Sequence, residues 1–406
     1  MYDIHIQTRV LSIRNYKFRL YPNPQQQKRL QNNLDVCRWV YNRFVEHVQN
    51  GFVSRNDLNY MLTELKQQES WLYNYHAKML QMISTKLDAA QKSIIELNKK
   101  GYKTGKIRFV RYDQYRTFTY NQTGYKFDKH GNTDLLWLSK IGHIEIRRHR
   151  EINGHVKQVI VSKSKTGKWH ACITCDVDVV LPEIHLSKSV GIDVGIKNLA
   201  YDSDGFVTPN PLNLTKLLRP LARVQRKISR RQKGSNNRKK AVKFYQIIHE
   251  RIKNRRKDFL HKLSTQYARK YNVVFLERLQ KLNMVKNHHF ARAILDSSWG
   301  TFAHMIDYKT MLIEVPAKNT TIDCSRCGNA VPKSLAVRTH RCNICGLVID
   351  RDHNASINIL KKGLEICGIV LNSNCLNIPQ ELREVTSVEI LRVSRKQKNT
   401  IGFIQR

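Results

Sequence analysis

Two cysteine pairs constrain the fold of this chain more than any other feature. Cys324-Ser-Arg-Cys327 and Cys342-Asn-Ile-Cys345 share the C-x-x-C spacing, with fourteen residues between them. Two such pairs can place four thiolates tetrahedrally around one Zn²⁺, and Gly328 and Gly346 permit the tight turns that bring backbone N–H groups to the sulfurs. Disulfide bonds are the alternative, but the rest of the chain indicates a reducing compartment. We therefore predict a zinc ribbon over residues 321–347.

The other cysteines follow no metal-binding pattern. Cys172 and Cys175 also have C-x-x-C spacing, but they fall in an expected strand, where positions three apart face opposite sides. We expect both to be core residues, as are Cys37, Cys367 and Cys375. Nine cysteines in a chain without a hydrophobic N-terminal signal are typical of a reducing compartment. We expect a cytoplasmic location.

The balance of charge predicts a polyanionic partner. Lys and Arg number 71 against 32 Asp and Glu among 406 residues, a formal net charge of +39. A compact protein with such an excess repels itself unless a polyanion neutralises it, and nucleic acid does so with release of counterions. No run approaches the roughly 18 apolar residues that span a bilayer, so we expect no membrane partner.

The N-terminal part predicts a small β-barrel with helices inserted into it. A strand is expected over 16–21, within a leader and first-strand segment of residues 1–22. Apolar residues at helical spacing predict three helices across 23–104, and the period changes to two across 105–184. Short strands separated by regular turns indicate a barrel. We expect the first strand to join it across the helical insert.

From residue 185 to 320 strands alternate with helices, which predicts an α/β core. Within it, residues 216–270 are expected to form two basic helices joined at 234–237. Between Lys216 and Lys262 there are eighteen Lys or Arg and two acids. A solvated charged face is the plain alternative, but phosphate contact explains the imbalance better. The candidate contacts are Arg226, Lys227, Arg230, Arg231, Arg238, Lys239, Lys240, Arg251, Arg255 and Arg256.

Three acids are candidates for a catalytic metal site. Asp193 lies in an apolar strand between two glycines, Glu277 ends a second apolar strand, and Asp352 begins a helix. Each has an ordinary alternative: an edge-strand acid, a strand-end acid and a helix N-cap. If they converge at one sheet edge, they could hold two divalent ions about 3.5–4 Å apart for in-line phosphodiester cleavage. Oxygen ligands favour Mg²⁺.

Together these motifs resemble the TnpB family, the nucleases of small insertion-sequence transposons that are related to type V CRISPR effectors. The resemblance covers most of residues 15–362. It is carried by Tyr16-Lys-Phe-Arg-Leu-Tyr-Pro-Asn23, Arg38-Trp-Val-Tyr-Asn42, Gly191-Ile-Asp-Val-Gly-Ile-Lys197, Asp258-Phe-Leu-His-Lys-Leu263, Trp299-Gly300, the two cysteine pairs and Asp350-Arg-Asp-His-Asn-Ala355.

The resemblance implies a multidomain α+β and α/β protein with an RNase H-like (RuvC) nuclease core. In it, Asp193, Glu277 and Asp352 are the metal ligands, and the zinc ribbon precedes the last core segment at 348–365. It also implies a wedge-like barrel, a helical recognition insert, a guide RNA from the transposon end, and double-stranded target DNA cut beside a short adjacent motif. We expect a monomer. The tail at 366–406 has no sustained period and is compatible with disorder.

One departure from the family pattern keeps other functions open. The segment 308–314 runs almost directly from helix to strand, where the family has more residues. A catalytically impaired, RNA-guided DNA-binding repressor is one alternative, and a transposase that cuts and joins its own element ends is another. The presence of all three acids favours the nuclease.

Overall fold

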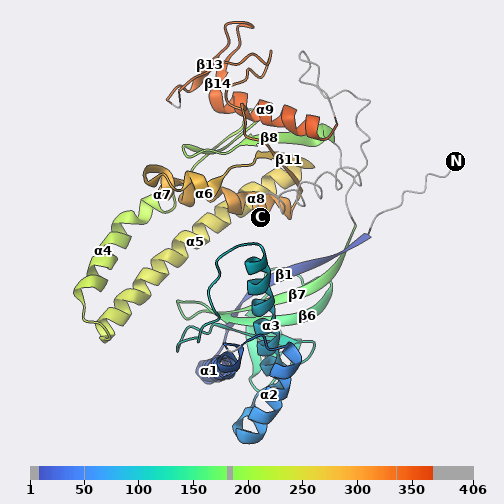
Figure 1. Ribbon diagram of the computed structural model, residues 1–406, viewed down its shortest axis with the longest axis vertical. Helices are drawn as coiled ribbons and strands as arrows, with labels where there is room; N and C mark the ends of the chain where they lie inside the picture. Colours follow the sequence, from blue (N-terminus) through green and yellow to red (C-terminus); the bar gives the residue numbers. More distant parts are fainter. Residues whose placement is uncertain (1–8, 50, 181–185, 335, 369–406) are drawn as a thin grey trace, which may run out of the picture. The chain divides into compact units, whose positions relative to one another are not determined.

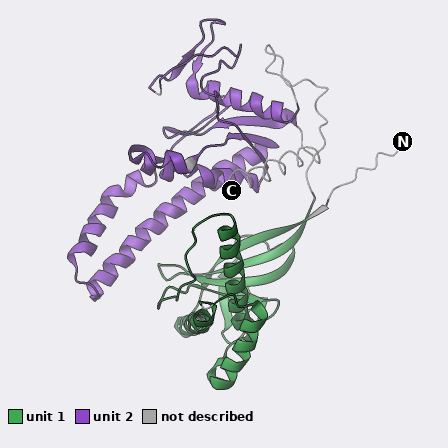
Figure 2. Cartoon of the chain, in the orientation of Figure 1, with its two compact units in different colours: residues 1–181, 406 green, residues 182–405 purple. Residues whose placement is uncertain are grey.

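The computed structural model describes residues 9–49, 51–180, 186–334 and 336–368. The chain divides into two compact units, residues 1–181 and 182–405 (Figure 2). None of the helices in the described ranges combines the length and apolar character needed to cross a membrane. Cys375 and most of the 366–406 tail lie outside those ranges.

Seven antiparallel strands form one curved sheet in the first unit (Figure 1). They are β1 (Arg9–Tyr21), β2 (Thr117–Asn121), β3 (Tyr125–His130), β4 (Thr133–Leu138), β5 (Gly142–Arg147), β6 (His155–Lys163) and β7 (Trp169–Val180), in the order β2-β6-β7-β1-β5-β4-β3. Strand β1 pairs with β7 and β5, so the first strand joins the sheet as expected, although it begins earlier, at Arg9. Among the described strands no ladder joins β2 to β3, and the barrel stays open on one side.

Three helices separate β1 from β2, as the apolar spacing predicted. They are α1 (Pro24–Val48), α2 (Arg55–Gln68) and α3 (Ala77–Lys99), with a short 3₁₀ turn at Ser70–Asn74. Asn23 begins α1, because its Oδ1 accepts from the backbone N–H of Gln26 over 2.8 Å. Buried apolar residues of these helices, such as Leu34 and Phe44, share one core with Phe18 and Phe118 of the sheet.

The second unit contains a five-stranded sheet in the order β10-β9-β8-β11-β12. Its strands are β8 (Ser189–Asp193), β9 (Asn198–Asp202), β10 (Val207–Pro209), β11 (Val273–Glu277) and β12 (Met311–Val315). Strand β11 is parallel to both β8 and β12, whereas β9 and β10 are antiparallel additions. This is the RNase H-like arrangement that the family resemblance implied.

Helices cover both faces of that sheet. Val274 and Leu276 of β11 pack with Leu263 of helix α5 (Asn236–Lys270) and Phe302 of helix α8 (Trp299–Asp307). Phe275 faces the other way and packs against helix α9 (Arg351–Ile366) (Figure 1). Because both faces of β11 are covered by helices, its sequence is a continuous apolar run.

Helix α4 (Leu218–Arg230) and α5 form the expected basic hairpin. Leu221 and Val224 of α4 pack against Ile248 and Ile252 of α5. The Ser235 side chain accepts from the backbone N–H of Arg238 and caps α5, which begins at Asn236, inside the connection predicted at 234–237. Helices α6 (Lys281–Met284) and α7 (His288–Ser297) follow β11.

The short 308–314 segment leaves the sheet intact. Helix α8 ends at Asp307, and β12 pairs with β11 over five positions. Lys309 fills the connection, because its Nζ donates to Ser264 Oγ and Thr265 Oγ1 of α5 over 2.6 and 2.8 Å. The structure therefore gives no sign that the shortening disturbs the core.

Candidate functional site

The topology brings the three candidate acids to one sheet edge. Asp193 ends β8 and Glu277 ends β11, and these parallel neighbours place their carboxyl ends together. Asp352 is the second residue of α9, which lies along β8. The helix can lie so close because position 191 is glycine: a Cβ there would sit 2.2 Å from the carbonyl oxygen of Ser356.

Burial disfavours charge on all three carboxylates, and repulsion from the other two adds to the effect at Asp193. Burial raises the pKa of Asp193 well above its ordinary value, and the charges of Glu277 and Asp352 raise it further. Burial also raises the pKa of Glu277, against a lowering hydrogen bond from Thr320. Burial and then Asp350 raise the pKa of Asp352. A divalent cation would relieve this repulsion, so the donor set fits a metal site.

Asp350, and not Asp352, is the N-cap of α9. Its Oδ1 accepts from the backbone N–H of Asp352 over 2.8 Å and from that of His353 over 3.4 Å. The ordinary reading of Asp352 as a cap is therefore wrong. Its carboxylate instead forms an ion pair with Arg338 of the ribbon, with 3.5 Å between Nη1 of the arginine and Oδ2 of the aspartate.

The carboxylates are less tightly gathered than the cysteines. Across the described residues, the only group of three or more His, Cys, Asp or Glu ligand atoms close enough for an ion is the cysteine cluster. Thr320 Oγ1 donates to Glu277, and Arg338 pairs with Asp352. Two of the three acids therefore have a protein partner.

The four predicted cysteines form one cluster, with all four Sγ atoms within 4.8 Å of one another. The two pairs have the same geometry: the N–H of Gly328 donates to Cys324 O, and the N–H of Gly346 to Cys342 O, over 2.9 and 3.0 Å. Backbone N–H groups of Cys345 and Ile344 lower the pKa of Cys342 to about 6. A tetrahedral thiolate site for Zn²⁺ fits this donor set.

The remaining cysteines lie elsewhere. Cys37 and Cys175 are buried in the first unit, Cys172 is half-buried on the opposite side of β7, and Cys367 is half-buried after α9. The expected strand position of Cys172 and Cys175 is confirmed, and so is the core position of Cys37 and Cys175, whereas Cys172 and Cys367 are less buried than expected.

Short strands β13 (Thr339–Arg341) and β14 (Val348–Asp350) complete the ribbon and lead into α9. A buried asparagine amide of α9 holds the backbone at the first C-x-x-C pair of the ribbon. Asn354 Oδ1 accepts from the backbone N–H of Ser325 over 2.9 Å, and Asn354 Nδ2 donates to Asp323 O over 2.8 Å. The ribbon is thus fastened to the helix that carries Asp352.

The ten basic candidates on the hairpin have different surroundings. Arg231 and Arg238 each donate to a backbone carbonyl near the hairpin turn. Arg256 donates to the buried carboxylate of Asp296 over 2.6 Å, which gives it a structural role. The other seven are exposed: Arg226, Lys227, Arg230, Lys239, Lys240, Arg251 and Arg255.

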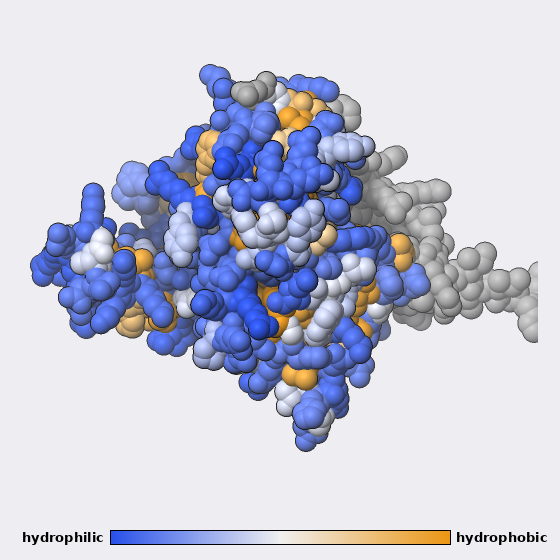
Figure 3. Space-filling model, turned by 90° about the horizontal axis from the view of Figure 1, so that it is seen from below, coloured by the Kyte–Doolittle hydropathy of each residue, from blue (hydrophilic) through white to orange (hydrophobic). Residues whose placement is uncertain are grey.

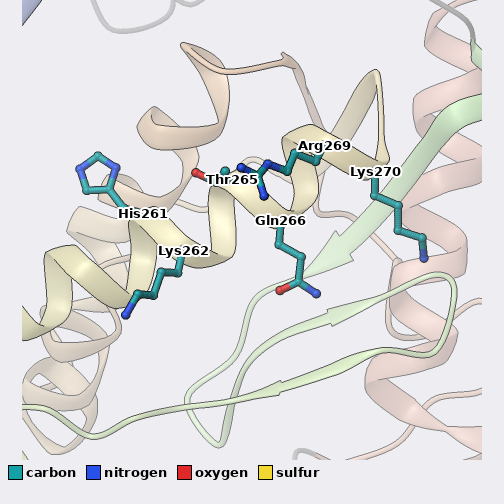
Figure 4. A pocket seen from close by; sticks show the side chains of 6 residues that line it. All are labelled: His261, Lys262, Thr265, Gln266, Arg269 and Lys270. Carbon is teal, nitrogen blue, oxygen red and sulfur yellow. The ribbon is translucent and has the colours of Figure 1, made fainter. Parts of the chain in front are cut away.

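The basic surface continues beyond the predicted residues. A hollow of ≈580 Å³ lies along the C-terminal half of α5, where Lys262, Gln266 and Arg269 recur at helical spacing (Figure 4). The face of the molecule in Figure 3 is mainly hydrophilic, with small scattered apolar patches. The hairpin predicted over 216–270 includes this stretch, but the candidate contacts end at Arg256, although the same periodicity could have indicated Lys262 and Arg269.

Known proteins match most of the chain. Residues 172–288 match the family described as "Probable transposase", and residues 299–359 match "Cas12f1-like, TNB domain". Residues 12–52 match a "Helix-turn-helix domain", a range that here covers most of β1 and all of α1.

Two curated relatives align over nearly their whole length. "Putative RNA-guided DNA endonuclease InsQ" of Escherichia coli (strain K12) is 30% identical over 390 residues, 88% of this chain and 94% of that protein. "Putative RNA-guided DNA endonuclease" of Streptomyces pristinaespiralis is 31% identical over 379 residues, 87% and 91% of the two chains. Other relatives are named "TnpB-like protein".

The fold also has a counterpart among solved structures. "Structure of the mini-RNA-guided endonuclease CRISPR-Cas_phi3" aligns with a TM-score of 0.50 at 9% identity, over 91% of this chain and 94% of that one, a likeness of fold alone. The relatives and the motifs agree, and the chain belongs to the TnpB family.

Proposed function

We propose that this chain is a transposon-associated, RNA-guided DNA endonuclease, with Asp193, Glu277 and Asp352 as the ligands of catalytic Mg²⁺. The observation that carries the proposal is the convergence of these three acids from β8, β11 and α9. Burial raises the pKa of each, and the charges of Glu277 and Asp352 raise that of Asp193 further. Buried carboxylates that lie close together are typical of metal sites, because a bound cation supplies the positive charge that neutralises them.

The chain's own residues supply the geometry of phosphodiester hydrolysis. Bound Mg²⁺ would activate water and stabilise the leaving oxygen. Thr320 orients the Glu277 carboxylate, and the close approach of α9 to β8 brings Asp352 near enough to Asp193 for its charge to raise the Asp193 pKa. Arg338 lies within ion-pair distance of Asp352, where a phosphate of the substrate could compete for its guanidinium.

The basic hairpin is proposed to bind the sugar-phosphate backbone of the guide RNA and its hybrid with the target. Its exposed Lys and Arg offer charge without sequence preference. In such a division of labour, base pairing reads the target and the protein reads the shape of the hybrid and a short adjacent motif. We assign motif recognition to the first unit, with its helical insert at 23–104, and structural Zn²⁺ to the ribbon.

A transposase is the second candidate, because the matched family over 172–288 carries that description. The same three acids could cut and rejoin element ends. The repressor reading loses its main support, since β12 forms normally despite the short 308–314 segment.

Guide dependence separates these functions. The chain is co-expressed with RNA from its transposon end, purified, and incubated with Mg²⁺ and plasmids that carry a matched or a scrambled target beside a randomised flank. The nuclease predicts linear product from matched targets and enrichment of one flank. Strand-transfer product without guide RNA supports the transposase, and tight matched binding without cleavage supports the repressor.

A further inference from the structure

Glu277 is held by a residue outside the three acids. Thr320, which is 2% exposed, donates its hydroxyl hydrogen bond to Glu277 Oε1. The hydroxyl also lies 3.2 Å from Ala317 O, an alternative acceptor.

The position of Thr320 depends in turn on α9. Asn358 is 6% exposed, and its Nδ2 donates to Thr320 O over 2.9 Å and to Asp323 O over 2.7 Å. Asn354, one turn earlier and fully buried, binds the backbone on both sides of Cys324. Both amides therefore grip the same stretch of backbone, residues 320–325.

The grip extends along the helix. Lys361 Nζ donates to Ser325 O over 2.6 Å, and Lys362 Nζ donates to Lys318 O. One face of α9 thus holds the whole segment from 318 to 325 by hydrogen bonds, and this segment includes the first cysteine of the ribbon. The same helix carries Asp352 at its start.

We propose that Thr320 is a positioning residue for Glu277, and that Asn354 and Asn358 couple it to the zinc ribbon. The inference rests on the function proposed above. Because residues 320–325 contain both the Glu277 contact and the first zinc ligand, zinc binding and carboxylate geometry depend on one piece of structure. Loss of a residue that hydrogen-bonds to a metal ligand typically lowers metal affinity by about 10–100-fold.

Two variants of Thr320 test the first part. Thr320→Val keeps the shape and removes the hydroxyl, whereas Thr320→Ser keeps the hydroxyl. Mn²⁺ binding to the protein–guide RNA complex is followed by electron paramagnetic resonance, beside the zinc content and the melting temperature. We expect Thr320→Val to bind Mn²⁺ at least about tenfold more weakly with zinc unchanged, and Thr320→Ser to remain within about twofold of wild type. Equal Mn²⁺ affinity in wild type and Thr320→Val overturns the assignment.

A double-mutant cycle tests the coupling. Asn358→Ala removes the grip without touching a cysteine or a carboxylate. If the ribbon acts through Thr320, the losses in Mn²⁺ affinity of Asn358→Ala and Thr320→Val are not additive, whereas independent effects add. Additive losses, or no loss in Asn358→Ala, contradict the coupling.

These readouts remain distinct from the proposed function. Mn²⁺ binding is measured without cleavage, so a chain that binds Mn²⁺ through Glu277 but cuts no matched DNA overturns the nuclease and still decides the role of Thr320. Glu277→Gln provides the reference for lost Mn²⁺ binding.

Discussion

The backbone N–H of Ser325 donates to Oδ1 of Asn354 over 2.9 Å. Ser325 follows Cys324, the first proposed zinc ligand, and Asn354 lies two residues after Asp352, so this bond joins the ribbon to the proposed nuclease site. The ribbon is therefore part of the construction of the site and not only a neighbouring module.

Zinc binding should require the ribbon cysteines alone. Cys342→Ser removes one thiolate of the four and is expected to lose zinc and unfold the ribbon, because the remaining ligands leave the site incomplete. Metal analysis of the purified protein gives the zinc content directly. Cys172→Ser, the matched change in the C-x-x-C of β7, should keep one zinc per chain. Full zinc in Cys342→Ser would contradict the assignment.

Position 191 should not tolerate a side chain. Gly191→Ala places a Cβ 2.2 Å from Ser356 O and 2.5 Å from Leu360 N, so α9 must move away from β8. We expect a loss of about 1–3 kcal/mol in the free energy of unfolding, and slower cleavage because Asp352 moves with the helix. Thermal unfolding and plasmid cleavage check both effects. Gly105→Ala, where a Cβ meets nothing within 4 Å, is the matched control.

The acids should make the metal-free protein more stable as the pH falls. The folded-state pKa of Asp193 is raised above its ordinary value, so the folded chain binds this proton more readily than the unfolded chain. The resulting penalty is present at neutral pH, and it is relieved as the pH falls through the raised pKa.

Asp193→Asn removes that penalty. Without divalent ions, the variant should melt at a higher temperature than wild type at pH 7, with a smaller difference near pH 5. Mg²⁺ should stabilise wild type more than the variant. Asp258→Asn, which alters an exposed ion pair with Lys262, should match wild type throughout. A lower melting temperature for Asp193→Asn at neutral pH would count against the electrostatic account.

The exposed arginines and lysines of the hairpin should contribute to the salt dependence of RNA binding. Replacing Arg226, Arg230 and Lys240 with Gln is expected to weaken guide RNA binding and to reduce the slope of log affinity against log salt by about 0.7–0.9 per lost phosphate contact. Filter binding over a salt series measures the slope. An unchanged slope would indicate a solvated face.

Arg256 should behave differently from those three residues. It pairs with the buried Asp296, so Arg256→Gln leaves a buried carboxylate without its partner. We expect a loss of about 3 kcal/mol in the free energy of unfolding, with little change in the salt slope. Chemical denaturation and the same binding series separate the two effects, and a slope change without destabilisation would return Arg256 to the phosphate contacts.

Much of this architecture was predictable because its signals are local. The cysteine spacing fixes the ribbon ligands, and apolar periods of 3.6 and 2 give the helices and strands. Asp193 and Glu277 could be placed together because parallel strands end at the same sheet edge. The family resemblance then supplied the order of these parts.

The missing parts depend on contacts between residues far apart in the sequence. Thr320 has no motif, and it acquires a role only because the fold brings Glu277 to it. Arg256 looks like its basic neighbours until Asp296, forty residues later, pairs with it. The sequence offers two nearby acids as the cap of α9, and it does not decide between them. Asp350 is the cap because of the backbone conformation of a single turn.

The most direct test of the central claim is cleavage of a matched plasmid by the protein–guide RNA complex in Mg²⁺, for wild type and for Asp193→Ala. Linear product is expected from wild type only, with guide RNA and target binding retained in both. Cleavage by Asp193→Ala at the wild-type rate would contradict the assignment of the three acids as the catalytic metal site.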